Sequence, residues 1–252
     1  MVRNIKLKVA YDGTNYHGWQ TQLNTPTIQE TTENAISIIT NQKVDLTGSG
    51  RTDSGVHALG QVANFTADTN IPEDKIKIAL NANLPNDIRI IDSEDVSLSF
   101  NSRFDAHDKT YMYQIYNDKV WSPFYNRYSC FVPSNLEFEK MEESVKGLIG
   151  THDFKGFMAA GSDVKTTVRT IYEAKLIKEG NIIKLYVTGN GFLYNMVRII
   201  AGTLIDIGKG VKNIECIENA INEHDRTLLG QTAAPQGLFL MNVNYMKKVL
   251  DT

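Results

Sequence analysis

The sequence predicts a fold of two α/β sandwich domains, each a sheet packed against helices. Three segments of the first half carry the alternating or apolar pattern of β-strands, namely 5–11, 61–66 and 88–91. Helical patterns that begin at Thr27 and Pro72 lie between these strands. The second half repeats this rough order of strands and helices. We therefore expect one domain over residues 1–101 and a second over residues 102–252.

The first half has clear helix and strand signals. Thr27 and Glu30 have the spacing of a capping box, so a helix begins there. Its inward face is predicted from apolar or small residues at three- and four-residue steps, namely Ile28, Thr32, Ala35 and Ile39. The apolar run Val44–Leu46 predicts a strand that leads into a glycine-rich stretch. In the second helix, the residues expected to face inward are Ile76, Ala79 and Leu80.

The second half continues with a strand over 110–116, in which Tyr111 and Tyr113 share one face. Tyr113 is interpreted as a core residue. The further elements predicted are a helix over 138–149, a long loop over 150–163, strands over 171–177 and 182–188, helices from 189 and over 211–221, and a final strand over 240–245. His152 and Asp153 fall in the long loop, and we interpret them as a capping or hydrogen-bonded pair rather than an acid–base pair.

The composition is that of an ordinary globular protein, with 42% hydrophobic and 22% charged residues in a chain of 252. No apolar run reaches the length of about 18 residues that a membrane span needs. The first six residues lack the apolar core of a signal peptide. Cys130 and Cys216 are far apart and have no metal-ligand neighbours, which indicates reduced thiols. We expect a cytoplasmic protein.

The net charge of −3 argues mildly against a nucleic-acid-binding protein, because such proteins usually carry a basic surface. The excess of acidic residues lies in residues 1–101, whereas the remainder is nearly balanced. A local basic groove therefore remains compatible with the composition.

The most unusual stretch is Thr47–Ala58, which contains three glycines together with Arg51, Asp53 and His57. Glycines this dense indicate sharp turns or close approach of another molecule. Arg51 and Asp53 have alternate spacing, so in an extended segment they share a face, where the cation favours the ionised carboxylate. Such a carboxylate can act as a nucleophile or general base. The alternative is a simple connection with an incidental ion pair.

Arg198 lies in a helical segment that is otherwise apolar on most of its circumference. A buried cation needs a partner, because an unpaired buried charge is very costly. The partner is either a local acid or Asp53, and we favour Asp53.

The segment Gly50–Ala58, followed by Gly60–Phe65, closely resembles the active-site motif of the bacterial tRNA pseudouridine synthase A family. The resemblance covers essentially the whole chain. It continues further along the chain, namely at Tyr11–Gln20, Phe100–Lys109, Tyr111, His152–Phe154 with Thr167–Ile171, the helical segment that carries Arg198, and Gly237–Leu240.

This resemblance implies an α+β protein with the pseudouridine synthase fold, in which two sandwich domains with mainly antiparallel sheets meet at a central cleft. It implies an isomerase that converts uridine to pseudouridine at positions 38, 39 and 40 in the anticodon stem-loop of tRNA. No cofactor or metal is implied. The family acts as a homodimer on the anticodon arm of tRNA, so we expect the same partners here, and no membrane.

The resemblance also assigns roles to single residues. The catalytic set is Asp53, Tyr111 and Arg198. Asp53 acts on the nucleotide, either by attack on the sugar or by proton abstraction, and Arg198 keeps it ionised and oriented. Tyr111 lies against the uracil ring. The substrate-binding set is Arg51, Tyr111, Leu238, Leu240 and Arg103.

Within this set, Arg51 is expected to fill the space left by the flipped nucleotide, and Arg103 to contact phosphate. Leu238 and Leu240 share one face of the final strand, and one or both are expected to line the uracil pocket. The tract Tyr11–Gln20 is expected to support the active-site loop.

Two alternatives remain open. The chain could be a non-catalytic RNA-binding module that uses the same cleft. It could also carry out the same reaction at another RNA site, because the motif specifies the reaction but not the nucleotide position that is modified.

Overall fold

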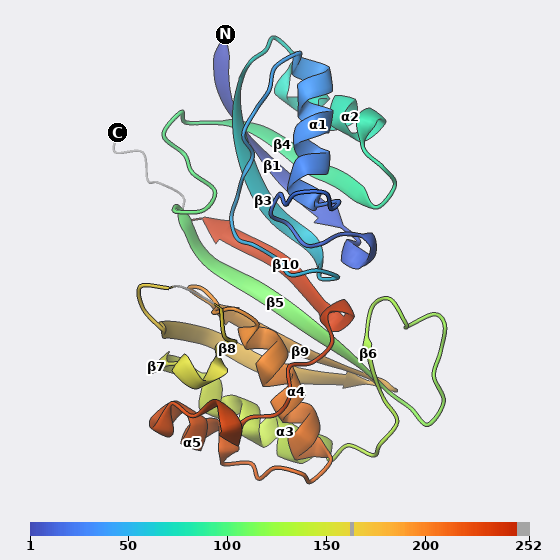
Figure 1. The fold of residues 1–252 in the computed structure, drawn as a ribbon, viewed down its shortest axis with the longest axis vertical. Coiled ribbons are helices and arrows are strands. Elements are labelled where there is room, and N and C mark those ends of the chain that lie inside the picture. Colours follow the sequence, from blue (N-terminus) through green and yellow to red (C-terminus); the bar gives the residue numbers. More distant parts are fainter. Residues whose placement is uncertain (162–163, 246–252) are drawn as a thin grey trace. The chain divides into compact units, whose positions relative to one another are not determined.

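Two parts of the chain form separate structural units in the computed structural model, which describes residues 1–161 and 164–245 (Figure 1). One unit comprises residues 1–107 with the described residues from 240 onward. The other unit comprises residues 108–239. Each unit contains a sheet and helices, and the sheets are mostly antiparallel, so the protein has an α+β fold.

The change of unit after residue 107 lies close to the boundary that the sequence predicts after residue 101. The end of the chain differs from the expectation. We placed the last strand in the second domain, whereas the residues from 240 onward group with the first unit.

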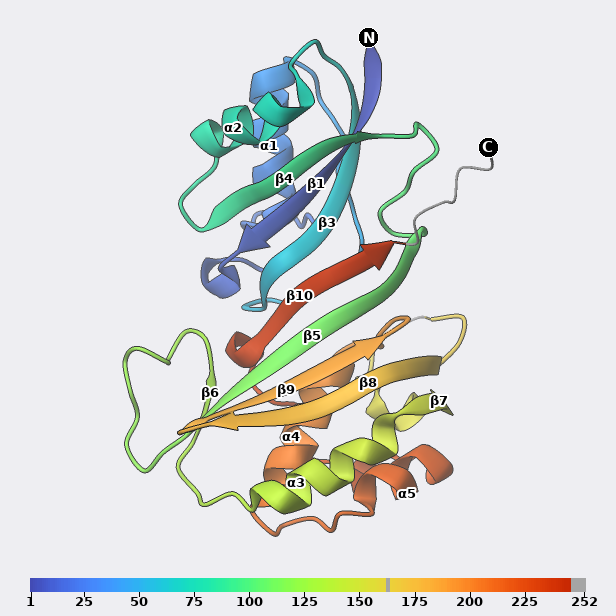
Figure 2. The ribbon, with the colours of Figure 1, turned by 180° about the vertical axis from the view of Figure 1, so that it is seen from behind.

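The strands of the first unit are β1 (Val2–Tyr11), β2 (Thr47–Gly48), β3 (His57–Asp68), β4 (Ile88–Val96) and most of β10 (Leu238–Tyr245). They are ordered β4-β1-β3-β10, with β2 paired to β3. β1 runs antiparallel to both of its neighbours. Helices α1 (Ile28–Thr40) and α2 (Glu73–Asn83) lie against one face of this sheet (Figures 1 and 2).

Alternation in β1 explains how this sheet and its helices form a core. Ile5, Leu7 and Val9 have no exposed surface, whereas the intervening Lys6 and Lys8 are only half-buried. The predicted start of α1 is confirmed, because Thr27 caps the helix and its side chain accepts a hydrogen bond from the Glu30 amide.

Two expectations for the first unit are wrong. Val44–Leu46 is not a strand, although Val44 and Leu46 are buried. Side chains of α1 satisfy its backbone instead: the Leu46 amide donates to Glu33 at 2.9 Å, and Gln29 donates to the Leu46 carbonyl at 3.1 Å. The inward face of α1 includes Ile36, which is fully buried, while Ile39 is only half-buried.

The second unit contains strands β5 (Ala106–Asn117), β6 (Cys130–Val132), β7 (Gly150–Asp153), β8 (Val168–Glu179) and β9 (Ile182–Gly189). The order β5-β9-β8-β7 is antiparallel throughout, and β6 adds a short parallel pair to β5. The helices are α3 (Phe138–Val145), α4 (Met196–Gly208) and α5 (Cys216–Glu223).

The segment 150–163 is not wholly a loop. Gly150–Asp153 forms β7, which pairs with β8, so His152 and Asp153 lie in a strand. Residues 162 and 163, at the end of the predicted loop, lie outside the described residues. The two side chains do not act as a pair: His152 contacts the Ile149 carbonyl at 3.0 Å, while Asp153 accepts from the Lys155 amide at 3.1 Å.

Helix α4 is buried on most of its circumference, as predicted. It begins at Met196 rather than near Gly189, because Asn195 adopts a left-handed conformation with φ of 61° directly before it. The helix also packs very closely on residues 229–234. A Cβ atom at Gly202 would lie 1.7 Å from the carbonyl oxygen of Gln231. Only glycine permits this approach, and it fixes the position of α4 within the second unit.

Within residues 1–161 and 164–245, the structure contains no helix that is long and apolar enough to cross a membrane.

We expect Gly202→Ala to destabilise the protein by about 3 kcal/mol, because a methyl group there must displace backbone rather than a flexible side chain. The measurement is the urea midpoint of unfolding. Gly191→Ala is the matched control, since a Cβ atom there meets Arg169 at an ordinary 3.5 Å, and we expect its midpoint to equal that of the wild type. Equal midpoints for both variants would contradict the close packing of α4.

Candidate active-site loop and its supports

Residues 49–56, which we call the Asp53 loop, connect β2 to β3 without regular pairing. Residues 11–20, the supporting tract, hold this loop from one side. The Trp19 amide donates to the Thr52 carbonyl at 3.0 Å, and the Gly55 amide donates to the Tyr16 carbonyl at 3.3 Å. These bonds satisfy backbone groups that would otherwise have no partner in a loop. The expected supporting role of this tract is therefore confirmed for the loop.

Two glycines allow the loop and the supporting tract to lie this close. Gly18 has a φ of +87°, and a Cβ atom there would lie 2.4 Å from the Thr52 carbonyl oxygen. At Gly48, a Cβ atom would lie 2.5 Å from the indole nitrogen of Trp19. Side chains at either position would push the loop away from its support.

Gln61 in β3 makes three side-chain hydrogen bonds, two of which hold the other side of the loop. Its side-chain oxygen accepts from the Ser49 hydroxyl at 2.6 Å and from the Val62 amide at 3.1 Å. Its side-chain nitrogen donates to the Gly50 carbonyl at 2.9 Å. Gln61 has no exposed surface, so these bonds are made away from water and are costly to lose.

Two further buried side chains complete the support. The Tyr11 hydroxyl is 2.8 Å from the Thr52 hydroxyl, and burial raises the pKa of Tyr11, so this contact stays a neutral hydrogen bond. His57, at the start of β3, is 1% exposed. Its Nδ1 accepts from the Gly13 amide at 3.1 Å and lies 3.2 Å from an oxygen of Asp12. Both contacts join the loop region to the supporting tract.

Asp53 is half-buried at the bend of this loop, where its carbonyl accepts from the Val56 amide at 3.1 Å. Arg51 is exposed, and its Nε donates to the Gln20 side chain at 3.1 Å. The Arg51–Asp53 ion pair expected from alternate spacing is not present between these two described residues. Arg51 contacts Gln20 of the supporting tract instead, and the chain turns directly after Asp53.

Tyr111 lies in β5 of the second unit and is 8% exposed. Its ring meets the ring of Phe192 edge to face, with centroids 5.0 Å apart. Tyr113 is fully buried, as predicted, and its hydroxyl donates to the Ala234 carbonyl at 2.7 Å.

Arg198 is half-buried in the first turn of α4. Its Nε donates to the Ala233 carbonyl at 2.8 Å, and one terminal nitrogen donates to the Asn195 side chain at 2.7 Å. The Ala233 amide in turn donates to the Arg198 carbonyl at 3.0 Å. These bonds hold the guanidinium group in one orientation, whereas a long arginine side chain without them would adopt several.

The predicted site residues are divided between the two units. Asp53, Arg51, Arg103 and Leu240 belong to the first, and Tyr111, Arg198 and Leu238 belong to the second. Leu240 is fully buried and Leu238 is 6% exposed. The pairing of Asp53 with Arg198, and the cleft that would hold both, stay predictions.

The sequence analysis missed several residues that position the site, namely Gln61, Ser49, Gln20, Asn195 and Phe192. A signal was present for Gln61, because it is a polar residue in a strand that is otherwise suited to burial. Asn195 lies only three residues before its partner Arg198, whereas the partners of Gln20 and Phe192 lie far away along the chain.

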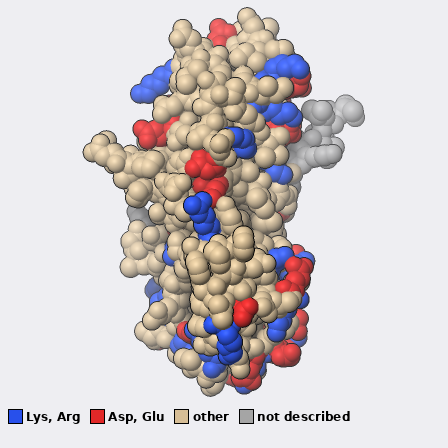
Figure 3. All heavy atoms as spheres, turned by 90° about the vertical axis from the view of Figure 1, so that its right-hand side faces the viewer, with Lys and Arg blue, Asp and Glu red and all other residues tan. Residues whose placement is uncertain are grey.

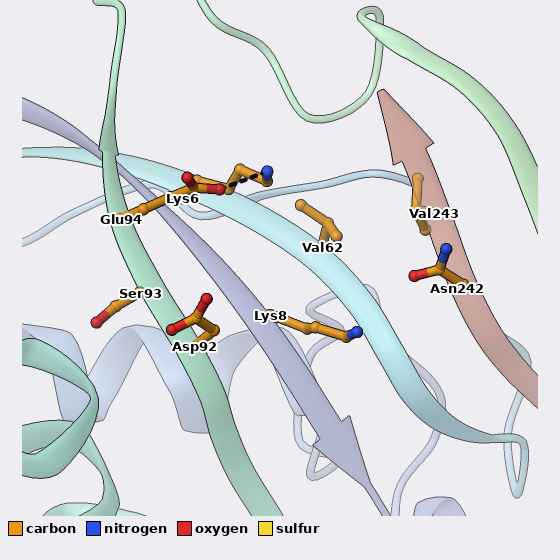
Figure 4. Close-up of a pocket in the computed structure, with 8 residues that line it drawn as sticks. All are labelled: Lys6, Lys8, Val62, Asp92, Ser93, Glu94, Asn242 and Val243. Carbon is orange, nitrogen blue, oxygen red and sulfur yellow. Dashed lines mark hydrogen bonds and ion pairs between the residues drawn. The ribbon is translucent and has the colours of Figure 1, made fainter. Parts of the chain in front are cut away.

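A hollow of about 190 Å³ on the first unit contains none of the predicted site residues (Figure 4). It includes an ion pair between Lys6 and Glu94 at 2.6 Å. On the face shown in Figure 3, positive and negative side chains are interspersed. Among the described residues, no group of three or more histidine, cysteine, aspartate and glutamate side chains could hold a metal ion.

Comparison with known proteins identifies relatives over the whole length. The sequence model of a family described as tRNA pseudouridine synthase matches residues 8–105 and 145–246. A tRNA pseudouridine synthase A of Acetivibrio thermocellus is 47% identical over 244 residues, which is 97% of this chain and 100% of that protein. Proteins of Caldicellulosiruptor bescii (tRNA pseudouridine synthase A) and Clostridium tetani (tRNA pseudouridine synthase A 2) are each 48% identical, with the same coverage.

Two solved structures are similar at low identity. An archaeal box H/ACA sRNP Nop10-Cbf5 complex matches with 13% identity and a TM-score of 0.39, over 92% of this chain and 46% of that one. A Cbf5-Nop10-Gar1 complex matches with 14% identity and a TM-score of 0.37, over 94% and 58%. The chain thus spans about half the length of these proteins.

We expect Gln61→Leu to lower the single-turnover rate of the enzyme at least tenfold, because it removes the two side-chain bonds that hold the Asp53 loop and costs about 2 kcal/mol of stability. Gln42→Leu is the control. Gln42 also makes three hydrogen bonds, to Thr40 and Asp68, but they lie outside the Asp53 loop. If both variants lose the same fraction of activity, Gln61 has no special role in the site.

Proposed function

The chain belongs to the tRNA pseudouridine synthase family and is therefore an isomerase of uridine in tRNA; we propose that its targets are the uridines at positions 38, 39 and 40 of the anticodon stem-loop. The observation that carries the catalytic part of this proposal is the placement of Asp53. Asp53 is half-buried, and the backbone of its loop is held by hydrogen bonds from the supporting tract and from Gln61.

The reaction is an isomerisation and needs no net exchange of atoms with another molecule. The bond between N1 of uracil and C1′ of ribose breaks, the base turns, and a bond between C5 and C1′ forms. The proton on C5 is lost and N1 gains one. Asp53 either attacks the sugar or abstracts a proton, and both roles need an ionised carboxylate held at a fixed position.

Arg198 is the proposed partner of Asp53. A cation beside the carboxylate favours its ionised form, and a guanidinium can hold both oxygens at once. Asn195 and Ala233 orient the Arg198 side chain, so little conformational freedom remains to be lost when it binds the carboxylate.

Tyr111, Leu238 and Leu240 are proposed to form the walls that receive the uracil. The Tyr111 ring packs edge to face with the Phe192 ring, which fixes its orientation. A tyrosine ring held in this way can stack on a flipped base. Leu238, at the start of β10, keeps a little exposed apolar surface, whereas Leu240 has none and would reach the uracil only if a neighbouring group moves.

The exposed cations are proposed to contact the rest of the RNA. Arg51 is exposed on the Asp53 loop and can fill the space that the flipped nucleotide leaves. Arg103 is exposed on the connection between β4 and β5 and can contact phosphate. Affinity should then fall steeply with salt, since each phosphate contact releases counterions.

The proposal also covers the cellular location and the oligomeric state of the active protein. We place it in the cytoplasm as a homodimer that binds the anticodon arm of tRNA, as the resemblance to the family implies. No cofactor is needed for the chemistry.

The experiment that tests this function is carbodiimide labelling of unmodified tRNA transcripts after incubation with the protein, followed by mapping of the labelled positions. Asp53→Asn should lower the rate about a thousandfold while tRNA affinity is retained, because the amide can neither attack nor accept a proton. Asp45→Asn, an equal change of charge outside the Asp53 loop, should keep the wild-type rate.

Label at positions 38 to 40 supports the proposed targets, and label only elsewhere contradicts them. Full activity of Asp53→Asn contradicts the catalytic assignment, whatever the position modified.

A further inference from the structure

The connection between β4 and β5 contains a short turn, residues 101–105, that displays two adjacent side chains to solvent. Phe104 is 78% exposed, and Arg103 beside it is also exposed. The guanidinium of Arg103 lies over the Phe104 ring, 5.6 Å from its centroid. Ser102, directly before them, has no exposed surface. The turn is therefore anchored by the buried Ser102, whereas the next two side chains, Arg103 and Phe104, are open to solvent.

The turn is closed by its own side chains. The Asn101 side-chain oxygen accepts from the amides of Arg103 at 2.9 Å and Phe104 at 3.2 Å. The Asp105 carboxylate accepts from the Asn101 amide at 2.9 Å, and the Asp105 amide donates to the Asn101 carbonyl at 3.0 Å. The backbone that carries the two exposed side chains is thus fixed before any ligand arrives.

Ser102 joins this turn to the sheet of the first unit. Its amide donates to the side chain of Asn64 in β3 at 2.9 Å, and its carbonyl accepts from the hydroxyl of Tyr245 in β10 at 2.7 Å. Asn64 is buried, and its amide group donates to Asn4 in β1 at 3.0 Å. Two strands, β3 and β10, therefore hold the turn directly, and β1 holds the Asn64 side chain that binds it.

The turn is also fastened to the start of the glycine-rich motif. The Ser102 hydroxyl donates to the carbonyl of Thr47 at 2.5 Å. Thr47 pairs with Asn64, and it precedes Ser49, which Gln61 holds. The turn and the Asp53 loop are thus tied to the same part of β3.

The chemistry of the displayed pair suits a nucleotide. An exposed aromatic ring offers a flat surface on which a base stacks, and such stacking is tolerant of base identity. A guanidinium over the ring adds a cation for the neighbouring phosphate and a second planar surface for the base. A lone exposed phenylalanine needs no explanation by itself. An exposed ring on a turn that its own hydrogen bonds fix, with a guanidinium over the ring and a link to the strand that supports the Asp53 loop, does need an explanation.

We propose that turn 101–105 is a nucleotide-binding site, in which Phe104 stacks on a base of the tRNA and Arg103 contacts an adjacent phosphate. The inference rests on the proposed function, since it takes tRNA as the ligand, and it assigns Phe104 a role in substrate binding. Phe104 contributes affinity rather than chemistry, because it holds a nucleotide other than the one that reacts.

The test measures the Kd for an unmodified tRNA transcript at several salt concentrations. Phe104→Ala should raise the Kd about tenfold, which corresponds to the loss of one base stack, and should leave the single-turnover rate at saturating enzyme unchanged. Phe104→Trp should restore wild-type affinity, and its fluorescence should change when tRNA binds. Arg103→Gln should lower the slope of log K against log salt by about one, whereas Phe104→Ala should leave this slope unchanged.

Phe124→Ala is the matched control, because Phe124 is also highly exposed, at 87%, but lies in the second unit. We expect its Kd to equal that of the wild type. A Kd of Phe104→Ala equal to that of the wild type overturns the proposal. A change in its oligomeric state with unchanged tRNA affinity also overturns it, in favour of a protein partner. Wild-type pseudouridine formation is scored in the same samples, so failure of the proposed function is seen separately.

Discussion

The structure of the site depends on one constraint: the Asp53 loop must bend tightly without strand pairing, and yet its backbone must not move. A loop of this kind has polar groups that neither helix nor sheet satisfies. Here the supporting tract and Gln61 satisfy them from opposite sides. The close approach at Gly18 and Gly48 makes this possible. A carboxylate mounted on such a loop is positioned before the substrate binds, which is where much of the catalytic advantage of an enzyme arises.

Arg198 meets a comparable constraint in the second unit. A cation in the first turn of a buried helix is costly unless its hydrogen-bonding groups have partners. The left-handed Asn195 ends the preceding loop and also supplies one of these partners. The Ala233 carbonyl supplies another, and the same segment packs on α4 at Gly202. The packing of this helix and the direction of its arginine are thus set by the same stretch of chain.

Much of the fold could be predicted from the sequence, because alternation and capping are local signals. Ile5, Leu7 and Val9 alternate with lysines, and Thr27 caps its helix, so both elements were predictable. The apolar run at Val44 indicated burial correctly but not a strand, because side chains of α1 satisfy the Leu46 backbone.

The site was predictable only in part. The motif identified Asp53, and the apolar helix identified Arg198 as a cation in need of partners. Local spacing suggested that Arg51 pairs with Asp53, but Arg51 contacts Gln20, which is distant in sequence. The support from Gln61 is likewise a matter of tertiary contacts that no periodicity reveals. The residues proposed to act could be named from the sequence, whereas most of the residues that hold them depend on tertiary contacts.

The central claim is that Arg198 steadies the carboxylate of Asp53. A double-mutant cycle measures it most directly, with the free energy of unfolding in urea determined for the wild type, Asp53→Asn, Arg198→Met and the double variant. We predict a coupling free energy of about 1 kcal/mol or more between the two positions. Strictly additive effects of the two substitutions would contradict the account.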